Sequence, residues 1–151
     1  MLILLSLTSC AVGAPAAFTL KSASVDPSHA CPLGANNLPY DLHATIEVRN
    51  GTSSTVTIKS VDAVMSLAAV KGAWLEPIGD RYDATAVSFS PASIPAGSAS
   101  TVNATIPSAC TNVRAPTAGP SYGEYAVAIR LITSAGTFTL NSANRHRILA
   151  A

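Results

Sequence analysis

The fold is decided by one stretch of the sequence, YDLHATIEVR at residues 40–49. Apolar side chains occupy every second position, and polar or charged side chains lie between them. The apolar set is Leu42, Ala44, Ile46 and Val48. A period of two, with one apolar and one polar face, is typical of an antiparallel β-strand that covers a core on one side.

The chain after this strand continues the pattern with one interruption. Asn50-Gly51 tolerates positive φ and predicts a turn. Apolar positions then run through Val56 and Ile58, and after Ser60 their parity shifts to Val61, Ala63, Met65 and Leu67. The shift predicts a β-bulge or a crossing between sheets. A short helix over residues 61–70 is the alternative, because Val61, Val64, Met65 and Ala68 also fit a 3.6-residue spacing.

Further strands are expected on both sides of this region. Their apolar rows are Phe18, Leu20 and Val25; residues 85–90; Val102, Ala104 and Ile106; Tyr125, Val127, Ile129 and Leu131; and Phe138 with Leu140. About seven short strands with turn signals between them, and no amphipathic helix, predict an all-β antiparallel sandwich. We expect one domain at residues 17–151, after a leader and tether at residues 1–16.

Composition excludes some classes of partner. Charged residues make up 11% of the chain and the net charge is +1, so no basic field is available to bind nucleic acid. No apolar run approaches the roughly 20 residues that a membrane-spanning helix needs. Any attachment to a membrane would therefore use a lipid anchor.

The leader raises the question of what Cys10 does. Leu7-Thr8-Ser9-Cys10 resembles the lipobox of bacterial lipoproteins, which implies that Cys10 is acylated and becomes the first mature residue. No Lys or Arg precedes the apolar run, and that run is short for a signal sequence. The alternatives are a plain secretory signal cut near Ala14-Pro15-Ala16, or a buried first strand in which Cys10 is an inert thiol.

A second resemblance concerns the sandwich itself. Gly123-Glu124-Tyr125-Ala126-Val127 resembles the start of strand F in immunoglobulin-like sandwiches, and the turn at residues 94–98 is similar to that of bacterial members. The resemblance implies that Tyr125 forms a tyrosine corner with the preceding loop. The antibody-type cysteine pair is absent, and Trp74 falls after the strand expected from Val56 onward, which would be strand C. The likeness is at superfamily level and implies a fold of the immunoglobulin or fibronectin-III kind, without an activity.

The resemblance also implies a partner for Cys31. Strands B and E are neighbours in such sandwiches and would here be the strands at residues 40–49 and 101–106. Cys31 before strand B and Cys110 after strand E would then meet in the loops of one pole. We expect a disulfide there; the alternative is two buried free thiols, which do not suit an exported chain.

Candidates for chemistry are few. Asp41, His43 and Glu47 share the polar face of the strand at residues 40–49 and are weak candidates for a metal site. Asp26 and His29 are close in sequence in an expected loop, with no obvious third metal ligand. His146 is expected in a C-terminal tail. Neither a nucleophile elbow nor a Gly-rich phosphate loop nor a Cys-x-x-Cys pair occurs. The sequence therefore predicts no enzyme and no cofactor.

Binding residues concentrate after Lys71, in what we expect to be one long loop. This candidate binding loop contains Trp74, Glu76, Asp80, Arg81, Tyr82 and Asp83. Trp, Tyr and Arg dominate interface hot spots. The competing interpretation is that Trp74 plugs the end of the sandwich while the charged residues pair among themselves.

Together these features predict an exported, non-catalytic, cell-envelope immunoglobulin-like module, either binding or structural, with a protein or glycan partner at the cell surface. The alternative is a small secreted metal- or carbohydrate-binding protein that uses the polar face of the strand at residues 40–49 or the Trp74 loop.

Overall fold

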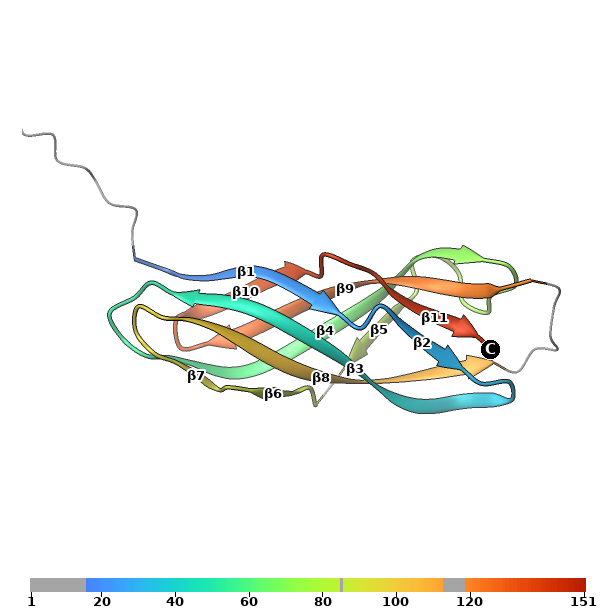
Figure 1. Cartoon of the computed structure of the whole chain (residues 1–151), viewed down its shortest axis with the longest axis horizontal. Coiled ribbons are helices and arrows are strands. Elements are labelled where there is room, and N and C mark those ends of the chain that lie inside the picture. The colour runs from blue at the N-terminus through green and yellow to red at the C-terminus, as the bar shows by residue number, and fades with distance from the viewer. Residues whose placement is uncertain (1–15, 85, 113–118) are drawn as a thin grey trace, which may run out of the picture.

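The computed structural model describes residues 16–84, 86–112 and 119–151. Two β-sheets pack face to face as an elongated sandwich (Figure 1). No helix in the described ranges is long and apolar enough to cross a membrane. The predicted lipidation site, Cys10, lies outside the described residues.

The first sheet has the strand order β1 (Phe18–Val25), β3 (Ala35–Asn50), β8 (Ala99–Asn112) and β6 (Ser88–Ser90). The second has the order β2 (Ser28–Cys31), β11 (His146–Ala150), β9 (Ser121–Thr133), β4 (Val56–Lys71) and β5 (Arg81–Ala84). In addition, β10 (Gly136–Asn141) pairs with β9, and β7 (Ser93–Ile94) pairs with β4. All pairings are antiparallel except that of β2 with β11.

This topology confirms the predicted fold class. The order β1-β3-β8-β6 corresponds to strands A-B-E-D of an immunoglobulin-like sandwich, and β4-β9-β10 corresponds to C-F-G. The described residues form more strands than the seven expected. The additional ones are short segments, such as β2 at the edge of the second sheet and β11 between β2 and β9, which are too short to produce a clear alternation.

The predicted alternation places the core. Apolar side chains of β3, β4, β8 and β9 point between the sheets and are almost completely buried; they include Leu42, Ile46, Met65, Leu67, Ile106, Ile129 and Leu131. Residues 61–70 lie within β4, so the helical alternative is wrong. The register of β4 against β9 shifts between Ile58 and Ser60, which confirms the predicted bulge.

The disulfide between Cys31 and Cys110 is present. Both cysteines lie within strands, β2 and β8, and not in loops as expected. Because β2 and β8 belong to different sheets, the disulfide joins the two layers covalently. The amide of Asn112 supports the same region by donating to the carbonyls of Cys31 and Ala151, at 3.0 and 3.2 Å.

The two ends of the sandwich carry different segments. The N–H of Gly51 donates to the carbonyl of Ala17 at 2.9 Å, so the chain enters β1 beside the turn between β3 and β4. At the opposite end lie the turn between β2 and β3, the loop at residues 72–80 and the C-terminus (Figure 1). The 16 residues of β3 separate these ends by about 50 Å.

Candidate functional site

A cavity of about 230 Å³ opens between the sheets at the C-terminal end of the sandwich. The first sheet contributes Asn37 and residues 108–111. The second sheet contributes Met65, Arg81, Tyr82, Tyr125 and Ile148, and the loop at residues 72–80 contributes Trp74, Glu76 and Asp80. Five of the six residues of the predicted binding loop therefore line one cavity; Asp83 does not.

The predicted single loop is interrupted by a strand. Arg81, Tyr82 and Asp83 belong to β5, which pairs with β4 from Ala63 to Ser66. The loop proper ends where Leu67 donates to the carbonyl of Asp80 at 2.9 Å. Four residues are too few for a periodic pattern to reveal a strand, so the sequence did not predict β5.

Trp74 packs directly on the backbone of β9. A Cβ placed on Gly123 would lie 2.6 Å from Cε2 of the indole, so only glycine leaves room for this contact. Trp74 is half-buried and packs against the core. Gly123 belongs to the motif that resembles strand F. The sequence did not predict that the indole of Trp74 packs against Gly123.

Tyr125 lies two residues further along β9 and lines the same cavity. Burial raises the pKa of Tyr125 to about 12; a hydrogen bond with Trp74 opposes this, while the charges of Glu76 and Asp80 add to it. The two carboxylates therefore act on the phenol hydroxyl. Part of the loop that a tyrosine corner would use, residues 113–118, lies outside the described residues.

The charged side chains that the structure describes at the cavity differ in their ion pairing. Arg81 forms an ion pair with Asp83, whose carboxylate lies 3.3 Å from the guanidinium. Within the described ranges, the side-chain carboxylates of Glu76 and Asp80 take part in no ion pair or hydrogen bond. Two carboxylates on the cavity wall thus have no counter-ion among the described residues.

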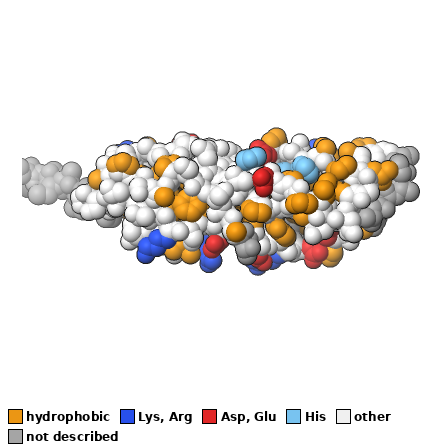
Figure 2. Space-filling view, turned by 90° about the horizontal axis from the view of Figure 1, so that it is seen from below, with side chains coloured by type: hydrophobic (Ala, Val, Ile, Leu, Met, Phe, Trp, Pro, Cys, Tyr) orange, Lys and Arg blue, Asp and Glu red, His pale blue; other side chains and the backbone are white. Residues whose placement is uncertain are grey.

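Exposed apolar side chains lie in the two segments that contribute residues to the cavity. The large hydrophobic residues that are exposed in the described part of the chain are Leu33, Leu38, Val70, Leu75, Ile78 and Tyr82. All of them fall in residues 33–38 or 70–82, the two segments that reach the cavity from opposite sheets. Figure 2 shows hydrophobic side chains gathered more densely toward this end of the visible face. We call these six residues the apolar rim.

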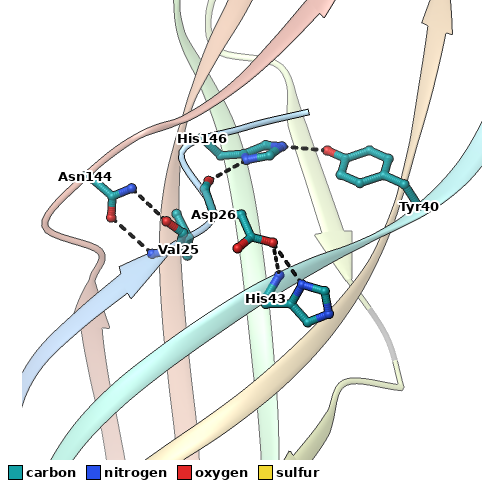
Figure 3. Close-up of polar contacts among 6 residues, drawn as sticks. All are labelled: Val25, Asp26, Tyr40, His43, Asn144 and His146. Carbon is teal, nitrogen blue, oxygen red and sulfur yellow. Dashed lines mark hydrogen bonds and ion pairs between the residues drawn. The ribbon is translucent and has the colours of Figure 1, made fainter. Parts of the chain in front are cut away.

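The predicted metal candidates do not converge. The ring Nδ1 of His43 lies 2.9 Å from the carboxylate of Asp26 (Figure 3), and Glu47 accepts a hydrogen bond from Thr101 at 2.9 Å. Asp41 is exposed on the same strand. The described residues contain no group of three or more His, Cys, Asp or Glu side chains that could hold a metal ion.

Two histidines lie elsewhere than expected. His146 begins β11 and is 1% exposed, so the expectation of a tail is wrong. Its ring forms two hydrogen bonds, one between Nδ1 and the carbonyl of Asp26 at 2.7 Å and one between Nε2 and the hydroxyl of Tyr40 at 3.0 Å (Figure 3). His29 stacks on the ring of Tyr40, with centroids 3.8 Å apart, and does not pair with Asp26.

This histidine cluster (His29, His43 and His146, with Asp26 and Tyr40) contains all three histidines of the chain. Burial lowers the pKa of His146; the carbonyl and charge of Asp26 oppose this, and His29 adds to it. Burial raises the pKa of Asp26, but hydrogen bonds from the backbone and ring of His43 outweigh it, so the net direction is downward. Burial also raises the pKa of Tyr40 to about 12.

Comparison of the sequence with protein-family models and with curated proteins gives no match. Similar solved structures include AggA, the major subunit of aggregative adherence fimbriae type I from Escherichia coli, at 12% identity over 89% of this chain and 95% of that one (TM-score 0.39). The copper-bound PCuAC domain from PmoF2 is 14% identical over 85% and 92% (TM-score 0.40). The CooA pilin subunit from enterotoxigenic Escherichia coli is 13% identical over 87% and 99% (TM-score 0.31). The three TM-scores are all below 0.5.

Proposed function

We propose that this chain is an exported, non-catalytic, immunoglobulin-like module that binds a protein partner through the cavity end of the sandwich. At the other end a lipid on Cys10 would tether it to the cell envelope. The observation that carries the proposal is the apolar rim, which lies in the same segments as the residues that line the cavity, among them Trp74, Tyr82 and Arg81.

The apolar rim favours a protein over a glycan. Exposed apolar side chains that gather in one place mark interaction surfaces, whereas scattered ones are ordinary. Leu75 and Ile78 are 44% and 64% exposed, and a partner that covers them must offer apolar surface of its own. A neutral oligosaccharide offers little such surface and no charge for Glu76 or Asp80.

Export is supported by the disulfide. Bridges such as Cys31–Cys110 persist in oxidising compartments and are rare in the cytosol of mesophiles. The position of the cavity also suits a tethered module, because a chain anchored ahead of Phe18 would present the cavity about 50 Å away from its attachment point.

Site-specific photocrosslinking in the native cells tests the binding surface. With benzoylphenylalanine in place of Ile78, we expect one discrete crosslinked product. The matched control places the same group at Thr137, an exposed position on β10 remote from the cavity, and should give none. Equal products from both positions, or no product from position 78, would refute the proposed binding surface.

The tether has its own test, the intact non-reduced mass of the protein isolated from native cells. A chain that begins at Cys10 and carries acyl groups is expected. A mass that begins near Ala17 without lipid would show a freely secreted protein, and the lipid anchor would be wrong.

A further inference from the structure

We infer that the cavity receives the ammonium or guanidinium group of a lysine or arginine side chain on the protein partner. The inference rests on the proposed function, because it names the group recognised at the same site. It depends on three features of the cavity wall: charge, aromatic lining and size.

The first feature is charge. Among the residues that the structure describes, the charged members of the lining are Glu76, Asp80 and Arg81. Arg81 already forms an ion pair with Asp83, and in the part of the chain that the structure describes neither Glu76 nor Asp80 forms one. A cationic ligand would form an ion pair with these two carboxylates. An anionic ligand would be repelled by them.

The second feature is the aromatic lining. Trp74, Tyr82 and Tyr125 contribute to the wall, and aromatic faces attract cations, most strongly where water is partly excluded. The pKa of Tyr125 is raised in part by Glu76 and Asp80, which places both negative charges within electrostatic reach of an aromatic wall. Charges also attract more strongly at a partly enclosed site than in bulk water.

The third feature is size. At about 230 Å³ the cavity is smaller than the roughly 300–1,000 Å³ typical of sites for whole small molecules. It is better matched to one long side chain. The residues on either side of the inserted lysine or arginine would then lie against the apolar rim, which accounts for exposed Leu75 and Ile78 beside an acidic cavity.

Blocked tripeptides test the inference directly. The probes are acetyl-Leu-Lys-Leu-amide, the same peptide with norleucine in place of lysine, and the same peptide with glutamate. Norleucine keeps the four-carbon stem and removes only the ammonium group. Trp74 is the chain's single tryptophan and lines the cavity, so its fluorescence reports binding. We expect the lysine peptide to bind about tenfold more tightly than the norleucine peptide, and the glutamate peptide to bind least.

The decisive variant is Glu76→Gln with Asp80→Asn, which removes both charges and keeps the side-chain shapes. It should abolish the preference for lysine over norleucine. The control, Asp41→Asn with Glu47→Gln, makes the same two changes on the exposed face of β3 and should preserve the preference. Equal binding of the peptides, no binding of any at millimolar concentration, or a lysine preference that survives the decisive variant would overturn the inference.

These outcomes are separable from the proposed function. If crosslinking from position 78 succeeds while the peptides show no preference for lysine, the end of the sandwich binds a protein by some other chemistry. If the crosslink also fails, the proposed binding function fails with it.

Discussion

His146 shows how a single buried side chain can be assigned a protonation state from its neighbours. The carbonyl of Asp26 can only accept, so Nδ1 of the neutral ring carries the hydrogen. Nε2 is then free to accept from the hydroxyl of Tyr40. Both ring nitrogens are satisfied in the neutral form, as buried polar groups generally are. Protonation would add a second donor facing Tyr40.

This arrangement makes folding stability depend on pH. Because the pKa of folded His146 lies below the ordinary value of 6.5, the unfolded chain binds its proton first as the pH falls. The free energy of unfolding should therefore decrease as the pH falls below about 6.5. The variant His146→Gln keeps an amide that can donate and accept, and does not titrate. Its loss of stability between about pH 7.5 and about pH 5.5 should be smaller than that of the native chain.

Urea unfolding of both proteins at the two pH values measures this difference. Asp26, Tyr40 and His29, which face His146, remain in the variant, so their own contributions largely cancel. An equal loss of stability in the two proteins would contradict the assignment.

At the scale of single elements, the contrast between β3 and β5 shows what the sequence can predict. The apolar face of β3 is fixed by four alternating side chains, and the parity shift after Ser60 predicts the bulge in β4, which the structure has between Ile58 and Ser60. In β5 and β11 only four and five residues pair, so neither has enough positions for a period to be visible. These two strands are stabilised by pairing with β4 and β9, which no local pattern records.

Gly123 offers a test of how one strand positions the loop opposite it. Gly123→Ala would place a methyl group too close to the indole of Trp74. Either the ring must move away from β9 or β9 must shift. Overpacking of this kind costs about 1–3 kcal/mol of stability. We expect that loss together with a red shift of the tryptophan fluorescence, because the indole becomes more exposed. Ala126→Val, on the outward face of β9, is the control and should leave the spectrum unchanged; an unshifted spectrum in Gly123→Ala would refute the contact.

For the molecule as a whole, the disulfide is the one covalent side-chain cross-link between the sheets among the described residues, in addition to the backbone connections. It joins residues separated by 79 positions, and closing a loop of that length is worth about 4–5 kcal/mol in the chain-entropy model. The double variant Cys31→Ala with Cys110→Ala should lose stability of that order in urea unfolding. The native chain treated with a reductant should approach the variant, and an unchanged midpoint in both would contradict the role assigned to the disulfide.

The candidate site could be predicted only in part, because its residues come together only when the whole chain is folded. The composition of residues 74–83 singled out Trp74 and its charged neighbours. The cavity also requires Asn37, Tyr125 and Ile148, which come from strands far apart in the sequence. Only the packing of one sheet on the other brings these residues to the same place.

The opposite placement of the N-terminal attachment and the cavity also has a mechanical consequence. If the chain is anchored ahead of Phe18 and its partner is held at the cavity, any pulling force runs along the length of the sandwich. β1 lies at the edge of the first sheet and is hydrogen-bonded only to β3 there, with its first residue paired to Asn50 at the anchored end. The force would slide β1 along β3 and load the hydrogen bonds of the pair together, instead of opening them one at a time. Such a joint resists pulling far better than one that peels, and this property suits a module that holds a partner at a cell surface.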